Sequence, residues 1–142
     1  MSLFASLSVS ASGMSAQRTR AELLVQNMAN AETTRTPDGG PYKRRDAVFS
    51  TDEQLSPFSA AFQSEISTGV SVSDVVEDTR PPERRFMPGH PDADKDGYVS
   101  FPNINPAEDM VDLMSASRGY EANVSAITAI KDMINRSIDL MS

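Results

Sequence analysis

The distribution of proline divides this chain more sharply than any other sequence feature. All nine prolines lie between Pro37 and Pro106, and the segments on either side contain none. Proline lacks the amide proton that a helix needs and clashes with the preceding turn, so long helices are confined to the two ends. The sequence therefore predicts three parts: an N-terminal helical segment over residues 1–33, a β-rich middle lobe with proline-rich loops over 34–104, and a C-terminal helical segment over 105–142.

The N-terminal segment carries a thin apolar stripe at helical spacing. Its members recur at three-, four- and seven-residue intervals and are Leu7, Met14, Ala21, Leu24, Met28 and Ala31. The residues between them are rich in serine, with a glycine at position 13, and are mediocre helix formers. We therefore expect a helix that is marginal alone and becomes ordered when it packs against a partner surface.

A stronger helix signal opens the C-terminal segment. Asn105 can act as the N-cap, Pro106 suits the first helical position, and Glu108 is placed to reach back toward the cap. An apolar stripe then continues at helical spacing through Met110, Leu113, Ser117, Tyr120, Val124, Ile127, Ile130, Ile134, Ile138 and Met141. Roughly 36 helical residues would span about 54 Å, too long for a compact globule of this size. We predict an α+β fold whose long terminal helices pair as an extended coiled-coil-like unit.

Strand and turn signals dominate the middle lobe. PDGGP at 37–41 predicts a turn, and AVFS at 47–50 and GVSVSDVVE at 69–77 predict strands. A further short strand is predicted over Tyr98–Phe101, and the prolines of PPERRFMPGHP at 81–91 exclude a helix there. The middle is therefore predicted to be a small lobe of hairpins.

Composition excludes several classes of protein. Thirteen basic against twenty acidic residues leave a formal charge of −7, which disfavours binding to nucleic acid because phosphate contacts need clustered cations. With 39% hydrophobic and 6% aromatic residues and no tryptophan, a large self-contained core is doubtful. The first residues lack the basic region of a signal peptide and are interpreted as mature protein. No apolar run approaches the roughly 18 to 20 residues of a membrane-spanning helix, so we expect no direct membrane insertion.

The sequence also gives little support for catalysis. His90 is the single histidine and lies in a turn between Gly89 and Pro91, so a Ser-His-Asp arrangement would have to be built around a loop residue. PDGGP lacks the lysine and the following helix of a phosphate-binding loop. We therefore predict that the protein is not an enzyme and carries no cofactor.

The run HPDADKDGYVSFPN at 90–103 resembles the first half of a calcium-binding loop. Asp92, Asp94 and Asp96 occupy alternate positions before Gly97. Asn103, however, stands where such a loop needs a bidentate glutamate, and prolines occupy the place of the flanking helices. We interpret the run as a tight hairpin turn, with a calcium-responsive binding protein that uses the Asp92–Asn103 loop as an alternative.

Three local features allow more than one interpretation. Gly119, inside the C-terminal helix, indicates the close approach of another helix, a bend, or a merely tolerated glycine. Asn27 and Asn30 either end the first helix, because asparagine tolerates the left-handed conformation, or contact a second helix. The basic cluster at 43–45 is interpreted as a solvated strand rather than a binding motif.

Two blocks of this sequence resemble the rod proteins among the axial proteins of the bacterial flagellum. QNMANAETTRTPDGGPYKRRDAVF at 26–49 is similar to the family's Asn-hydrophobic-Ala-Asn signature, its Pro-Asp-Gly turn and its tyrosine-initiated strand. GYVSFPNINPAEDMVDLMSASRGYEANVSAITAIKDM at 97–133 is similar to the series Gly-Tyr-Val, Pro-Asn-hydrophobic-Asn, Glu-x-Met and Ala-x-Arg-x-Tyr-x-Ala-Asn. Met28, Ile104 and Pro106 depart from the usual residues without contradicting a buried seam or a capped helix.

This resemblance implies a structural subunit of the flagellar basal body. Subunits of this family stack helically into a hollow proximal rod that transmits motor torque, and their paired terminal helices form the wall of the export channel. The implied partners are further copies, rod proteins of the FlgB, FlgF and FlgG types, the adaptor FliE, and the flagellar type III export apparatus. The implied location is the basal-body rod across the periplasm, reached without a cleavable signal peptide.

The family motif and the two stripes together define the residues that we expect to pack in the helix pair or the assembly. The motif places Asn27, Asn30, Met110, Arg118, Tyr120, Ala122 and Asn123 at packing positions. The stripes add Leu7, Met14, Leu24, Met28, Leu113, Val124, Ile127, Ile134 and Ile138. A soluble coiled-coil adaptor, whose ends pair with a different protein and form no rod, is the second alternative.

Overall fold

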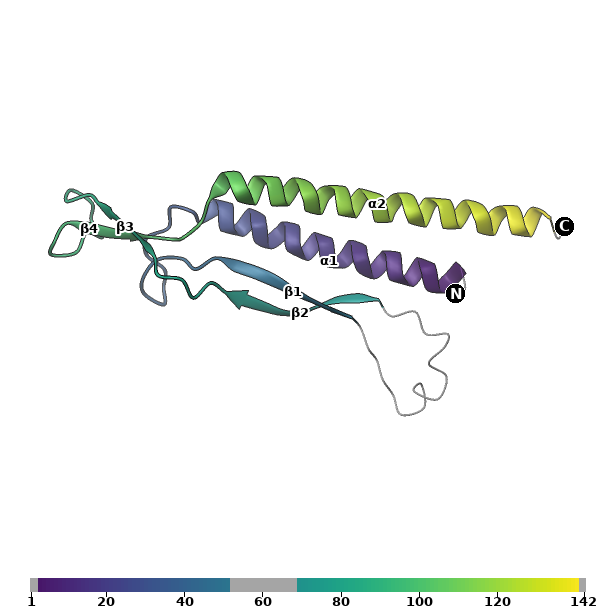
Figure 1. Cartoon of the computed structure of the whole chain (residues 1–142), viewed down its shortest axis with the longest axis horizontal. Coiled ribbons are helices and arrows are strands. Elements are labelled where there is room, and N and C mark those ends of the chain that lie inside the picture. The colour runs from purple at the N-terminus through teal and green to yellow at the C-terminus, as the bar shows by residue number, and fades with distance from the viewer. Residues whose placement is uncertain (1–2, 52–68, 141–142) are drawn as a thin grey trace, which may run out of the picture.

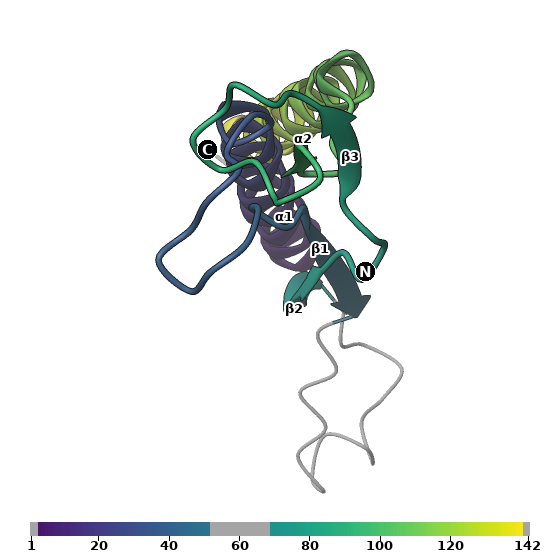
Figure 2. The same ribbon diagram turned by 90° about the vertical axis from the view of Figure 1, so that its left-hand side faces the viewer.

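The computed structural model describes residues 3–51 and 69–140 of the 142-residue chain. Two long helices, α1 (Leu3–Ala29) and α2 (Pro106–Asp139), lie side by side and run in opposite directions, as Figures 1 and 2 show. Among the described elements, α1 contacts both α2 and a two-stranded sheet, whereas α2 contacts α1 alone. The first helix therefore lies between the second helix and the sheet.

The described strands form two separate antiparallel pairs. β1 (Arg45–Thr51) pairs with β2 (Val70–Glu77) alongside α1, with a bulge between Val48 and Phe49. β3 (Glu83–Phe86) pairs with β4 (Tyr98–Phe101) beyond the helix pair, at the end away from the termini (Figure 1). The strands predicted at 47–50, 69–77 and 98–101 are confirmed, whereas β3 was not predicted.

The end of α1 differs from the sequence expectation. The helix ends at Ala29, and the Asn30 side chain donates a hydrogen bond from Nδ2 to the Gln26 carbonyl oxygen at 2.9 Å. Among the described residues only glycines have a positive φ, so Asn30 does not adopt the left-handed conformation expected of it. The Gln26 carbonyl oxygen also accepts a hydrogen bond from the Asn30 amide at 3.1 Å, so the end of this helix is closed by Asn30 without a backbone reversal.

The start of α2 largely agrees with the prediction. The Asn105 side chain accepts a hydrogen bond from the Ala107 amide at 3.2 Å, and Pro106 occupies the first turn. Within the described residues, Glu108 makes no reciprocal bond to Asn105, so the expected capping box is only half formed. Glu108 and Asp109 still place negative charge in the first turn, where it favours the helix dipole.

Two tight turns depend on glycine. In the predicted turn at 37–41, Gly39 and Gly40 have φ values of 89° and 79°, and the Thr36 amide donates to the Gly40 carbonyl oxygen at 2.8 Å. Gly97, with a φ of 79°, precedes β4, where an added Cβ would lie 2.9 Å from the Phe86 ring. Side chains rarely adopt such backbone angles, so both turns require glycine.

The apolar core is small. Its buried hydrophobic members are Ala16, Leu24, Ala116 and Ile130 on the helices, and Val99 and Phe101 on β4. Neither helix is apolar over a stretch long enough to cross a membrane within the part of the chain that the structure describes. With so little burial, the fold must be stabilised by specific polar contacts or by neighbouring molecules.

Candidate functional site

The register of the helix pair is set by two glycines. A Cβ added at Gly13 would lie 3.1 Å from the Asn123 side chain, and one at Gly119 would lie 3.3 Å from Gln17. Gly119 therefore permits close approach of a second helix, which was one of its predicted roles. In this register Leu3 is level with Met133, and α2 continues about two turns beyond the start of α1 (Figure 1).

Asn27 joins the end of α1 to the start of β1. Its fully buried side chain donates from Nδ2 to the Arg45 carbonyl oxygen at 2.8 Å and accepts from the Arg45 amide at 2.9 Å through Oδ1. The Tyr42 hydroxyl donates to the same Oδ1 at 3.1 Å. Asn27 does not end the helix, because α1 continues to Ala29, and its predicted contact with a second helix stays a prediction. Its side chain supplies the hydrogen bonds that a neighbouring strand would otherwise give to Arg45.

A buried ion pair joins Arg44, the residue before β1, to the start of α2. The Arg44 Nη2 lies 2.8 Å from the Asp109 Oδ1, and the two side chains are 17% and 1% exposed. Asp46 and Asp112 also approach the same guanidinium nitrogen, at 3.5 Å and 3.9 Å. The interpretation of 43–45 as a solvated strand is therefore wrong for Arg44, which is largely buried.

Burial has a larger effect on the pKa of Asp109 than the ion pair with Arg44 has. Loss of solvent raises the pKa of its carboxyl group, Arg44 lowers it, and the nearby acidic groups raise it further. The Asp109 Oδ2 and the Arg44 Nε are buried without hydrogen-bond partners, although they belong to the two sides of one ion pair. This contact therefore fixes the position of the segment before β1 relative to the start of α2 more than it adds to stability.

We use the term junction for this end of the helix pair, defined by Leu24, Asn27, Tyr42, Arg44 and Asp109. Leu24 is 3% exposed and supplies the apolar part. A second ion pair, between the Arg20 Nη2 and the Asp112 Oδ1 at 3.3 Å, joins the helices beside it. The junction thus brings together α1, β1 and α2, which are far apart in the sequence.

The predicted packing residues divide into two groups. Ten are at least partly buried: Leu7, Met14, Leu24, Asn27, Met28, Asn30, Leu113, Asn123, Ile127 and Ile134. Six are exposed: Met110, Arg118, Tyr120, Ala122, Val124 and Ile138. Roles in assembly remain a prediction for both groups.

The division has a geometric cause. The seam toward α1 follows Asp109, Ala116, Asn123 and Ile130 at seven-residue intervals, and three of these four are polar or small. The stripe of large apolar residues is offset from this seam, so that only part of it reaches α1. We use the name α2 flank for the exposed stripe residues Met110, Tyr120 and Val124 together with the neighbouring Met114; their exposures are 59%, 38%, 40% and 53%.

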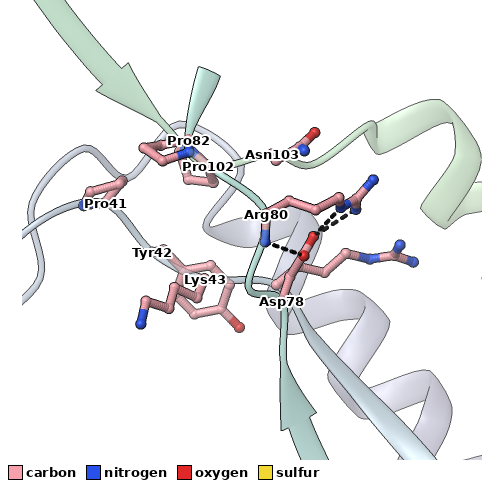
Figure 3. Close-up of a pocket in the computed structure, with 9 residues that line it drawn as sticks. Pro41, Tyr42, Lys43, Asp78, Arg80, Pro82, Pro102 and Asn103 are labelled. Atoms are coloured by element: carbon pink, nitrogen blue, oxygen red, sulfur yellow. Dashed lines mark hydrogen bonds and ion pairs between the residues drawn. The ribbon is translucent and has the colours of Figure 1, made fainter. Parts of the chain in front are cut away.

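A small groove opens beside the junction (Figure 3). We call it the proline groove; its lining residues are Pro41, Tyr42, Lys43, Arg44, Asp78, Arg80, Pro82, Pro102 and Asn103. Its volume is about 60 Å³, well below the roughly 300 Å³ at which small-molecule sites begin. The groove suits a protruding part of a protein better than a cofactor.

The aspartates of the run at 90–103 serve the turn rather than an ion. The Asp94 Oδ1 accepts hydrogen bonds from the amides of Asp96 at 3.0 Å and Tyr98 at 2.8 Å, and these bonds lower the pKa of Asp94. Asp92 accepts a bond from the Thr34 hydroxyl at 2.8 Å. Across residues 3–51 and 69–140, no three histidine or acidic side chains are grouped as metal ligands. The calcium alternative gains no support from this arrangement.

Comparison with known proteins identifies the family. The chain is 39% identical to the flagellar basal-body rod protein FlgC of Borreliella burgdorferi over 150 residues, which cover 99% of both chains. It is 38% identical to FlgC of Bacillus subtilis over 99% of both chains, and 34% identical to FlgC of Salmonella typhimurium over 99% of this chain and 98% of that one. The chain belongs to the FlgC family of flagellar basal-body rod proteins. It is accordingly a structural protein of the basal-body rod and not an enzyme.

A second comparison concerns the C-terminal part. Residues 95–140 match the family model described as "Flagellar basal body rod FlgEFG protein C-terminal". That range contains β4 and α2, including the α2 flank and Asp109. The part that the FlgC chain shares with other rod proteins is thus the helix with the exposed apolar residues.

Sequence reasoning missed the junction residues Arg44 and Asp109. Arg44 was hidden in a basic cluster, and Asp109 was excluded from the apolar stripe because it is charged. The one available signal was the seven-residue spacing of Asp109 with Ala116 and Ile130, which follows the seam.

Proposed function

We propose that this FlgC-family chain is an axial subunit of the proximal rod, stacked helically with further copies and related rod proteins. Its terminal helices pair as a coiled-coil-like unit, form part of the export channel wall and transmit motor torque. The observation that supports this proposal best is the α2 flank, because no other described element of the chain covers it.

The α2 flank has the chemistry of a contact surface. Met110, Met114, Tyr120 and Val124 are exposed apolar side chains on one side of α2, whereas apolar side chains scattered singly are ordinary on protein surfaces. Apolar area exposed on the single subunit is removed from water when helices of neighbouring subunits pack on it, at about 25 cal/mol per Å². Burial at the subunit contacts then supplies stability that the small internal core does not.

Membership of the FlgC family supports a proposal for the neighbours of this subunit. We propose that rod proteins of the FlgB, FlgF and FlgG types and the adaptor FliE contact this subunit within the rod across the periplasm. We also propose that the chain is delivered through the flagellar type III export apparatus. The incomplete burial of the helix pair supports export, because a weakly stabilised chain is unfolded at small cost.

A pair of substitutions on α2 tests the proposal. Val124→Asp places a charge on the α2 flank, whereas Ala129→Asp places one at an exposed position on another side of α2. We expect Val124→Asp to abolish swimming and incorporation into purified basal bodies, because the charge would be buried without a partner in the rod. Ala129→Asp should leave both unchanged, and circular dichroism should show the same helix content in both isolated variants. Normal motility of both Val124→Asp and Met114→Asp would contradict the proposed contact.

A further inference from the structure

We propose that the acidic turn of one copy, residues 92–97, contacts the rim of the proline groove of a second copy, with Asp96 of the turn facing Lys43 of the groove. This inference rests on the proposed assembly of the chain into a rod. It assigns a role to the aspartate-rich run that the family function leaves unexplained, and it names the two surfaces that meet.

The walls of the proline groove are held in place by hydrogen bonds. The Tyr42 hydroxyl donates to the buried Asn27, and the Tyr42 amide donates to the Thr33 carbonyl oxygen at 3.0 Å. On the other side, the Asp78 amide donates to the Arg44 carbonyl oxygen at 2.8 Å. Together with three prolines, whose φ angles are fixed, these bonds give a surface that needs little ordering when it binds.

The lining of the groove contains more basic than acidic side chains, in contrast to the chain as a whole. Lys43, Arg44 and Arg80 outnumber Asp78 in the lining, although the whole chain carries a net charge of −7. Arg44 is engaged by Asp109, and Arg80 lies 2.6 Å from the Asp78 carboxylate, a contact drawn in Figure 3.

Lys43 is the cation of the groove that is most free to bind a partner. Its Nζ makes one long contact, 3.9 Å from Glu77, and both side chains are exposed. An exposed ion pair of that length contributes little in water, so a partner carboxylate can replace it at small cost.

Of the three aspartates in the acidic turn, one is available to bind a second copy. Asp92 and Asp94 are engaged by Thr34, by the arginines Arg35 and Arg84, and by the backbone of the turn. The Asp96 side chain is exposed and makes no hydrogen bond or ion pair in the described part of the chain. Because Asp94 and Gly97 fix the turn, Asp96 is presented on a rigid support.

The contact has the symmetry that a rod requires. The turn lies in the β3–β4 loop at the end of the molecule away from the termini, whereas the groove lies beside the junction (Figures 1 and 3). A contact between two different surfaces of one chain is heterologous, so each added copy leaves a free groove and a free turn. Such contacts continue along a helical assembly instead of closing a dimer.

Disulfide cross-linking tests this inference directly, because the chain contains no cysteine. Differently tagged Lys43→Cys and Asp96→Cys copies would be expressed together in a motile strain that depends on this chain, and its basal bodies would be oxidised mildly. We expect a linked pair that carries both tags. The matched control combines Lys43→Cys with Glu121→Cys, an exposed position on α2, and should give no linked pair.

Charge exchange provides a second measurement that does not depend on disulfide geometry. Lys43→Glu should lower the amount of this chain in basal bodies several-fold, and adding Asp96→Lys should restore it. Incorporation of the cysteine variants without a linked pair, together with no rescue, would overturn the contact while leaving the proposed rod function intact. Absence of the unmodified chain from basal bodies would overturn both, and linkage of position 43 to a different rod protein alone would overturn the choice of partner.

Discussion

The two ends of the helix pair are stabilised by different means. At the junction, Leu24, Asn27 and Asp109 are at most 3% exposed, and polar side chains join two helices and a strand. At the opposite end, residues 3–15 of α1 and 127–139 of α2 contribute Ile130 as their one buried side chain among the described residues, while Phe4 and Ile138 are 76% and 55% exposed. The helix pair is therefore well packed at the junction and poorly packed at the opposite end. Such a difference is expected of a subunit whose exposed apolar side chains are buried by neighbouring subunits.

A comparison of two asparagines tests this difference most strongly. Asn27→Ala removes three hydrogen bonds at the junction and leaves the Arg45 amide and carbonyl without partners. We expect a loss of about 2–3 kcal/mol in the free energy of unfolding, measured by urea denaturation followed by circular dichroism.

Asn123→Ala is the matched variant in the other half of the pair. The Asn123 side chain donates to the Gly119 carbonyl oxygen of its own helix at 2.8 Å, and alanine is the better helix former. We expect its free energy of unfolding to stay within about 0.5 kcal/mol of the unmodified chain. Equal losses in the two variants would show that the ends do not differ as described.

The contribution of Asp109 to the free energy of unfolding should be smaller than that of Asn27, and it should depend on pH. Because burial raises its pKa in the folded state, the folded chain binds this proton more tightly than the unfolded chain does. The resulting stabilisation is fully present below the unfolded pKa and is lost as the pH rises through the raised folded value.

Asp109→Asn removes this titration. The free energy of unfolding of the unmodified chain, relative to the variant, should therefore fall as the pH is raised from the acid range to neutrality. Urea denaturation of both proteins across that range measures the change, which we expect to be smaller than the effect of Asn27→Ala. A relative stability that rises with pH would mean that Arg44, and not burial, dominates at Asp109.

Local signals in the sequence predicted most of the elements. Asn105 caps its own helix, and Asp94 and Gly97 shape their own turn, so neighbouring residues suffice to identify them. The two long helices followed from the absence of proline at both ends. These features depend on chemistry within a few residues, which is visible in a single sequence.

The junction could not be predicted because its contacts join distant residues. Asn27 binds Arg45 across 18 residues and Arg44 binds Asp109 across 65, and neither side chain looks unusual within its own segment. The offset between the α2 stripe and the seam also depends on α1, because the helix pair buries Asp109 and Ala116 of α2 in place of large apolar residues. Sequence periodicity located the stripe but not the part of it that another subunit can use.

Hydrogen exchange of the isolated, dilute chain tests the difference between the two ends most directly. The account predicts slow exchange of amides around Leu24, Asn27 and residues 109–116, fast exchange over residues 3–15 and 127–139, and slow exchange at both ends once the chain is in basal bodies. Uniformly slow exchange along both helices of the isolated chain would contradict it, because the terminal ends would then be complete without neighbours.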